Sequence, residues 1–198
     1  MRIAKMKVCS YYEHIAPRPP TKITNMPTLA EPPLTAARCS LDVAITLKTF
    51  YPAPRADVFG FIVAEDVLPK ILTGFGPLPA VVGTAERTGP WDQPGSSRKV
   101  ILKDGSTVRE AVTDHVTGSY FAYRIWDFGH PIVRALASGA TGRWWFDTVE
   151  GGTQVVWTYT FTARNRLTRA PLWLLANLLW RGYMQVCLRN SGRFIEQR

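Results

Sequence analysis

The sequence predicts an α+β domain in which a curved antiparallel sheet wraps around one long C-terminal helix, with two short helices near its start. Three observations favour this class. Strand patterns follow one another without the alternating helices of a parallel sheet. Residues 153–162 alternate between large apolar and polar side chains. From about Leu167, apolar residues recur at helical spacing. A sheet curled around a helix in this way leaves a hydrophobic cavity between them.

The clearest strand is the segment 153–162. Val155, Trp157, Tyr159 and Phe161 share one face, because successive side chains of a strand point to opposite sides. The helix that follows presents an apolar stripe against which this aromatic face can pack. The stripe comprises Leu172, Leu175, Ala176, Leu179, Tyr183, Val186, Cys187 and Phe194.

The chain divides into a proline-rich N-terminal extension, residues 1–39, and a single ligand-binding domain, residues 40–198. The extension shows no sustained period, and proline lacks the donor that strands and helix interiors need. We therefore expect an extended arm or tail that is either disordered or wraps the domain, and Tyr11, Tyr12 and Ile15 could let part of it pack there.

The domain begins with an alternating strand at 41–48, ended by prolines. Short helices are predicted at 55–63 and 67–72, and a strand at 80–87. The loop that follows is rich in Gly and Pro, and it leaves Trp91 either exposed or folded back.

Residues 97–114 are predicted to form a β-hairpin, signalled by Asp104-Gly105. A three-residue loop at 104–106 keeps the apolar residues of both strands on one face, whereas a two-residue loop mixes the faces. The three-residue loop also turns both Arg98 and Glu110 inward.

Two more strands are predicted before the long aromatic one. In the strand 119–128, alternate residues such as Tyr123 point inward. A helical turn is expected at 132–137. The strand 142–148 then carries Trp144 on its inward face.

Charge and cysteine content limit the possible classes of function. The net charge is +9, but the basic residues are scattered, which favours a basic solvated surface over attraction to nucleic acid or to an anionic membrane. Three dispersed cysteines, Cys9, Cys39 and Cys187, give neither a disulfide framework nor a zinc site. The most apolar window, 171–180, is too short to span a bilayer, so we expect no stable membrane insertion and a cytoplasmic protein.

The order of elements resembles that of the SRPBCC superfamily, the START and birch-pollen-allergen-like group, and especially its polyketide cyclase/dehydrase-like branch. The residues that carry the likeness are Arg98–Gly105 with Glu110, then Tyr123-Arg124-Ile125, then Gly152–Trp157. The likeness covers about residues 41–198. It implies the helix-grip fold and a hydrophobic cavity beneath the long helix, in a superfamily that includes aromatase/cyclases, lipid carriers and hormone receptors.

Three residues are the candidates for chemistry in such a cavity. An inward Glu110 would be desolvated, which raises the pKa of a carboxyl and suits it to move a proton. Arg98 and Tyr159 would polarise carbonyl groups of a substrate. The alternative is an Arg98–Glu110 ion pair that only ties the sheet together. His115 and His130 are further candidate bases, expected in loops at the cavity mouth.

Aromatic side chains with polar tips are the candidate ligand-binding residues, because they combine apolar area with hydrogen-bond donors. The alternative is that they only fill a core. The predicted set comprises Tyr123, Trp144, Trp157, Phe161, Phe128, Leu179 and Tyr183. Neither a cofactor nor a metal is expected, since the three histidines show no ligand spacing.

A second apolar surface is predicted on the outer side of the C-terminal helix, from Trp173, Leu174, Leu178 and Trp180. It could form a homodimer, bind another partner or mark a membrane surface. Alternatively, the N-terminal extension covers it.

Two functions follow from these features. The first is an enzyme that needs no cofactor and acts by orientation, a cyclase or dehydratase for a polyketide-like or aromatic molecule. The alternative is a non-catalytic protein that binds or transfers a lipid or another small molecule. A third reading is a protein-interaction module that uses the outer helix surface.

Overall fold

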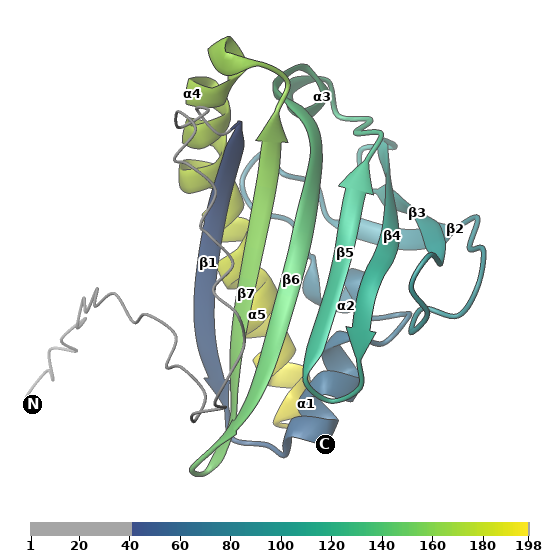
Figure 1. Cartoon of the computed structure of the whole chain (residues 1–198), viewed down its shortest axis with the longest axis vertical. Helices are drawn as coiled ribbons and strands as arrows, with labels where there is room; N and C mark the ends of the chain where they lie inside the picture. The colour runs from purple at the N-terminus through teal and green to yellow at the C-terminus, as the bar shows by residue number, and fades with distance from the viewer. Residues whose placement is uncertain (1–40, 198) are drawn as a thin grey trace, which may run out of the picture. The chain divides into compact units, whose positions relative to one another are not determined.

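The computed structural model of the chain describes residues 41–197, which belong to one compact unit, Arg38–Arg198. The predicted N-terminal extension, with Cys9 and Cys39, lies outside the described residues. Seven antiparallel strands form one sheet in the order β1-β7-β6-β5-β4-β3-β2 (Figure 1). The strands are β1 (Asp42–Tyr51), β2 (Val81–Ala85), β3 (Ser97–Leu102), β4 (Thr107–Val116), β5 (Tyr120–Trp126), β6 (Ala137–Val149) and β7 (Gly152–Ala163).

The helices gather on one face of the sheet, and α5 crosses behind β1, β7 and β6 in Figure 1. Register shifts in the β2–β3, β4–β5 and β6–β7 pairs bend the strands, so the sheet curves toward the helices. The predicted α+β class and the curved antiparallel sheet with a long C-terminal helix are confirmed. The helices are α1 (Arg55–Ile62), α2 (Leu68–Ile71), α3 (Pro131–Leu136), α4 (Arg166–Leu175), the π-helical turn η1 (Ala176–Trp180) and α5 (Arg181–Ile195).

The β3–β4 hairpin has the predicted inward face but a different loop. Arg98 pairs with Glu110, and both are buried. The loop is Lys103–Gly105, because Gly105 N donates to Leu102 O and Leu102 N donates to Ser106 O. The predicted loop, 104–106, was wrong by one residue at each end. Each β3 residue therefore pairs with the β4 residue two positions earlier than predicted. Because side chains alternate with a period of two, the same residues still point inward.

The central strands bury the side chains that their alternation predicted. Trp144 pairs with Trp157 across β6 and β7, and both are buried. The strand β6 begins at Ala137, five residues before the predicted start, because α3 leads directly into it. Trp91 is folded back, with the Arg98 guanidinium 3.7 Å above its ring.

The C-terminal helix starts with a capping box. The Asn165 side chain accepts a hydrogen bond from Thr168 N at 3.0 Å, and Thr168 Oγ1 accepts one from Asn165 N at 3.1 Å. These bonds satisfy backbone donors that the first turn of a helix leaves free. The start at Arg166 agrees with the predicted start near Leu167.

The π-helical turn η1 interrupts the predicted stripe. A π turn holds about one more residue than an α turn, so it rotates the residues after it around the axis relative to a continuous α-helix. The predicted inward Phe194 is therefore 39% exposed, and its neighbour Ile195 is 5% exposed. Leu172, Ala176, Tyr183 and Cys187 are buried as predicted.

Candidate functional site

A cavity of about 120 Å³ lies between the inner face of the sheet and the helices. Seven of the predicted site residues line it: Glu110, Tyr123, Phe128, Trp157, Tyr159, Phe161 and Tyr183. Arg98 and Trp144 instead line a second cavity of about 40 Å³. Leu179 lines neither, and Trp180 lines the larger one.

Trp180 lines the cavity where Leu179 was predicted to lie, and the π turn explains this difference. In a continuous α-helix, Leu179 would share a face with Leu172 and Ala176. The additional residue in η1 places Trp180 there instead. The expectation that Trp180 belongs to the outer apolar surface was wrong for the same reason. A π turn has no reliable sequence signal, so periodicity alone could not find this residue.

Glu110 and Arg98 form a buried ion pair in the wall between the two cavities. Arg98 Nε donates to Glu110 Oε1 at 2.6 Å, and Arg98 Nη1 donates to Glu65 O at 2.7 Å. Burial raises the pKa of Glu110 above its ordinary value, and the adjacent Arg98 guanidinium opposes that rise. The alternative of an ion pair that ties β3 to β4 is therefore present in the structure.

The aromatic wall is built from three elements. On β7, the rings of Tyr159 and Phe161 lie 4.8 and 5.3 Å from that of Trp180. Tyr183, on α5, has its ring 5.2 Å from Trp180, and its hydroxyl donates to Pro79 O at 2.9 Å. Behind them, the indoles of Trp144 and Trp157 stack at 4.2 Å.

The tyrosines of this wall are hydrogen-bond donors rather than bases at neutral pH. Burial raises the pKa of Tyr123 and of Tyr159, and the charge of Glu110 adds to the rise at Tyr123. Burial also raises the pKa of Tyr183. A phenol that is protonated at neutral pH can donate to a ligand oxygen but cannot take up a proton from carbon.

Three ring nitrogens around the cavity make no hydrogen bond of ordinary geometry with another described residue. Within residues 41–197, the buried side-chain polar atoms without a partner are His130 Nδ1, Trp157 Nε1 and Trp180 Nε1. All three residues line the larger cavity. An unpaired buried donor costs about 1–3 kcal/mol, so a ligand oxygen placed here would relieve this cost.

The two candidate histidines have different positions. His130 lies in the loop before α3 and lines the cavity, as expected for a residue at its mouth. His115 lies within β4 rather than in a loop, and its ring packs edge-on against Phe59 and Phe121. It lines neither cavity.

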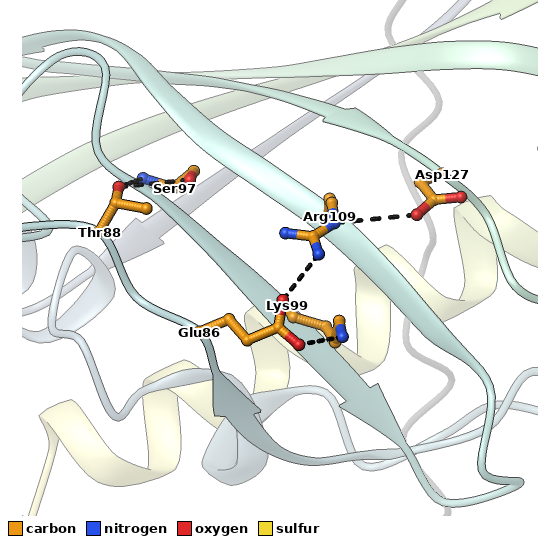
Figure 2. Close-up of polar contacts among 6 residues, drawn as sticks. All are labelled: Glu86, Thr88, Ser97, Lys99, Arg109 and Asp127. Atoms are coloured by element: carbon orange, nitrogen blue, oxygen red, sulfur yellow. Dashed lines mark hydrogen bonds and ion pairs between the residues drawn. The ribbon is translucent and has the colours of Figure 1, made fainter.

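The loop that carries His130 is held by close backbone contact and by ion pairs. Gly129 N donates to Thr107 O at 2.7 Å, and a Cβ on Gly129 would lie 2.7 Å from Thr107 N. Arg109 Nε lies 3.8 Å from Asp127 Oδ2 at the start of the loop (Figure 2). Asp127 has a φ of 56°, in the left-handed region that residues other than glycine seldom adopt.

The same arginine connects the loop to the edge of the sheet. Figure 2 shows Glu86 between Arg109 and Lys99. Arg109 Nη2 donates to Glu86 Oε2 at 2.7 Å, and Lys99 Nζ donates to Oε1 of the same carboxylate. These side chains project from the face of the hairpin that points away from the cavity, so they fix its rim without entering it.

Two other kinds of site are absent from the described part of the chain. Within residues 41–197 no three His, Cys, Asp or Glu side chains come close enough to hold a metal ion. No helix in the same range is long and apolar enough to cross a membrane.

Residues 43–193 match the family model described as polyketide cyclase / dehydrase and lipid transport. No curated protein sequence matches the chain. Among solved structures, Ara h 8.0201 is similar at a TM-score of 0.58 and 14% identity, over 79% of this chain and 99% of that one.

Two enzymes are similar in the same way. The di-domain ARO/CYC BexL gives a TM-score of 0.60 at 20% identity, over 80% of this chain and 51% of that one. Norcoclaurine synthase from Thalictrum flavum, in complex with dopamine and hydroxybenzaldehyde, gives 0.58 at 9% identity, over 79% of this chain and 88% of that one. At these identities the likeness concerns the fold.

Proposed function

The chain belongs to the family described as polyketide cyclase / dehydrase and lipid transport, and from this we propose that it binds a small, oxygen-bearing hydrophobic molecule in the cavity beneath the C-terminal helix. One observation carries the proposal. The larger cavity has an aromatic wall, and three buried ring nitrogens that line it have no partner within residues 41–197. An apolar pocket with a few convergent polar groups is the usual form of a small-molecule site.

The polar groups define the chemistry of the ligand. An indole N–H can only donate, so Trp180 requires an acceptor such as a carbonyl, ether or hydroxyl oxygen. The N–H of Trp157 has the Tyr123 hydroxyl nearby, outside ordinary hydrogen-bond geometry, and can donate to a ligand oxygen instead. The protonated phenols of Tyr123 and Tyr159 also donate. A carbonyl compound fits this set of donors better than a hydrocarbon does.

The volume of the cavity limits the size of the ligand. At about 120 Å³ it is close to engineered cavities of about 150 Å³ that bind benzene. A single ring therefore fits within this volume, whereas a polycyclic polyketide would extend beyond it. Norcoclaurine synthase, which shares the fold, is seen with dopamine and hydroxybenzaldehyde, each of which contains one ring.

Catalysis is the second candidate function, and the position of His130 favours it. Imidazole is the side chain most often used to move protons near neutral pH. His130 Nδ1 is buried without a partner in the lining of the same cavity as Glu110. A cyclisation or dehydration would use one of these two groups to remove a proton next to a carbonyl that the indole and phenol donors polarise. Arg98 does not line this cavity, and its role in such a reaction is to hold Glu110 through their ion pair.

A matched pair of ligands tests the binding proposal. Acetophenone and ethylbenzene have similar size and shape, but only acetophenone carries an oxygen acceptor. Calorimetric titration of the full chain should show tighter binding of acetophenone. The variants Trp157→Phe and Trp180→Phe should remove this preference, and Trp145→Phe, on the outer face of β6, should keep it. Equal affinities for both ligands would refute the assignment of the donors.

A dehydration assay tests the catalytic candidate. A one-ring aryl β-hydroxy ketone loses its α-proton to a base and its hydroxyl as water, and the conjugated product absorbs at longer wavelength. If His130 and Glu110 move protons, His130→Gln and Glu110→Gln should each lower the rate about 10²-fold or more. His115→Gln is the control and should leave the rate unchanged. Retained ligand binding without turnover would support the non-catalytic alternative, a binding or transfer protein.

A further inference from the structure

The outward face of α4 and η1 is apolar and solvent-exposed. Leu167 is 88% exposed, Leu178 is 69% exposed, and Trp173 and Leu174 are each 50% exposed. The opposite side of the same helix carries Leu172 and Ala176, which are fully buried. The helix is therefore apolar on both sides, and the inner side alone is explained by the core.

These residues are contiguous on the surface. Leu167, Pro171, Leu174 and Leu178 follow one another at intervals of three or four residues, so they line up along one side of the helix. The short helix α3 packs against α4 at the same end of the sheet (Figure 1) and adds the exposed Ile132. We call this set, with Trp173, the outer apolar face.

Basic residues surround this face, and acidic residues are missing from its segment. Between Glu150 and Glu196 the sequence contains six arginines and no Asp, Glu or Lys. Arg164 and Arg166 are exposed at the start of α4, and Arg134 is exposed on α3. Arg181 follows η1. Within residues 41–197, none of these four arginines takes part in an ion pair with an acidic side chain.

Charge decides between the possible occupants. A second copy of the chain would bring one arginine-rich face against another. The N-terminal extension contains six basic and two acidic residues within residues 1–40, a net charge of +4, so it is not complementary either. A nucleic acid would pair with the arginines but leave the leucines in water. An anionic bilayer accepts both, because leucine and tryptophan enter the acyl boundary while arginine stays at the phosphates.

We propose that the outer apolar face docks the protein reversibly onto anionic lipid bilayers. Leu167, Leu174 and Leu178 enter the interface, and Arg164 and Arg166 contact lipid phosphates. This is attachment at the surface of a bilayer rather than a span. The proposal does not depend on the cavity having a ligand.

The docking face and the cavity share their walls. Leu178 points outward from η1, while Trp180, two residues later, lines the cavity. On α3, Ile132 is exposed and Val133 lines the cavity. Docking therefore brings the lipid surface next to the wall of the ligand site.

Flotation of the full chain with lipid vesicles tests the proposal. The protein should float with vesicles of phosphatidylcholine containing about 30% phosphatidylserine, and not with phosphatidylcholine alone. The double variant Leu174→Gln/Leu178→Gln should bind at least about tenfold more weakly. The control Val82→Gln/Val116→Gln, at exposed valines elsewhere, should bind as the unaltered chain does.

The electrostatic part has its own matched pair. Arg164→Gln/Arg166→Gln should lower affinity about tenfold or more and reduce its salt dependence, whereas Arg55→Gln/Arg143→Gln, with the same net charge, should not. All these side chains are exposed, so folding should be preserved, and the arginine pair tests the proposal even if the leucine pair misfolds.

Four results would overturn the docking proposal. The first is absence of binding to either vesicle type. The second is equal vesicle affinity of the leucine variant and its valine control, or of the two arginine double variants. The third is a dimer that Leu174→Gln/Leu178→Gln dissociates, which would assign the face to a second copy. The fourth is vesicle binding that appears only after deletion of residues 1–38, which would mean that the extension covers the face in the full chain.

Discussion

Gly142 determines where the side chain of Tyr123 lies in the wall of the cavity. The two residues are paired across β5 and β6, and a Cβ on Gly142 would lie 2.2 Å from Tyr123 Cζ. The tyrosine ring therefore occupies the volume that any other residue would fill. The sequence predicts that Tyr123 faces inward, but the role of Gly142 depends on strand register, which alternation alone does not give.

Replacing Gly142 with alanine should move Tyr123 and weaken ligand binding. We expect Gly142→Ala to cost about 1–3 kcal/mol in the free energy of unfolding, since the ring must leave a packed position. Gly60→Ala is the control, because a Cβ there meets no atom within 4 Å and alanine favours the helix α1. Urea unfolding and acetophenone titration measure the two effects. Gly142→Ala should lower the free energy of unfolding and Gly60→Ala should raise it. A Gly142→Ala variant with unchanged stability would contradict this account.

The Arg98–Glu110 pair is a residue-scale feature whose pH dependence can be predicted. Burial gives Glu110 a folded-state pKa above its unfolded value. Stability from this group is therefore fully present below the unfolded pKa and is lost as pH rises through the folded pKa. The guanidinium limits this loss by stabilising the carboxylate.

Removal of the guanidinium should increase this pH dependence. Arg98→Met should lose about 3–5 kcal/mol in the free energy of unfolding at neutral pH, because it leaves a buried carboxylate unpaired. The loss should shrink as the pH is lowered toward about 4, where Glu110 is protonated. Urea unfolding between about pH 4 and pH 8 measures the loss of stability at neutral pH and its decrease at low pH. Arg98→Met/Glu110→Gln should lack the steep pH dependence, and an equal slope in both variants would argue against this origin.

The π turn η1 is the element that sequence periodicity missed. Apolar spacing correctly predicts a long helix and the burial of Leu172, Ala176, Tyr183 and Cys187 on it. After η1 the buried stripe widens: Met184, Leu188 and Ile195 are buried one position after the residues that a continuous α-helix gives, beside the predicted Tyr183 and Cys187. The inward faces of the strands were easier to predict. An error of two residues in the pairing of two strands leaves the same side chains on the same face.

A one-residue deletion tests the π turn directly. Deleting Leu178, which is exposed, should turn η1 into ordinary α-helix while α4 and α5 keep their buried faces. We expect the free energy of unfolding to change by about 1 kcal/mol or less. Deleting Arg189, an exposed residue of α5, should rotate the buried residues after it out of the core and cost several times more. Circular dichroism and thermal unfolding distinguish the two, and equal damage would count against a π turn here.

At the scale of the whole molecule, the fold was largely predictable, whereas the size and the exact lining of the expected cavity were not. Alternation in β1, β6 and β7 and the apolar helix specify a sheet packed against a helix. Whether the space between them is filled depends on volumes summed over many side chains. The set of polar-tipped aromatics was the available signal, and it included Trp157 and Tyr159, which line the larger cavity. It also included Trp144, which closes the wall from behind and lines only the smaller cavity.

The cavity lowers the stability of the whole domain. Space in a protein interior lacks the packing contacts that side chains would make there, which costs about 24 cal/mol per Å³ where a cavity is closed. Filling it with Val108→Phe should raise the free energy of unfolding by about 1 kcal/mol and abolish binding of acetophenone. Val82→Phe, on the exposed side of β2, is the control and should do neither. Unchanged binding in Val108→Phe would place the ligand site elsewhere.

The stacked indoles of Trp144 and Trp157 also give the protein an optical signal of its own. Two nearly parallel rings 4.2 Å apart couple their electronic transitions, so the pair should produce a couplet in the ultraviolet circular dichroism spectrum. Only Trp157 faces the larger cavity. A molecule that enters the cavity and tilts this ring would alter the couplet without any label. Occupancy can thus be followed by spectroscopy while the identity of the natural ligand is still being sought.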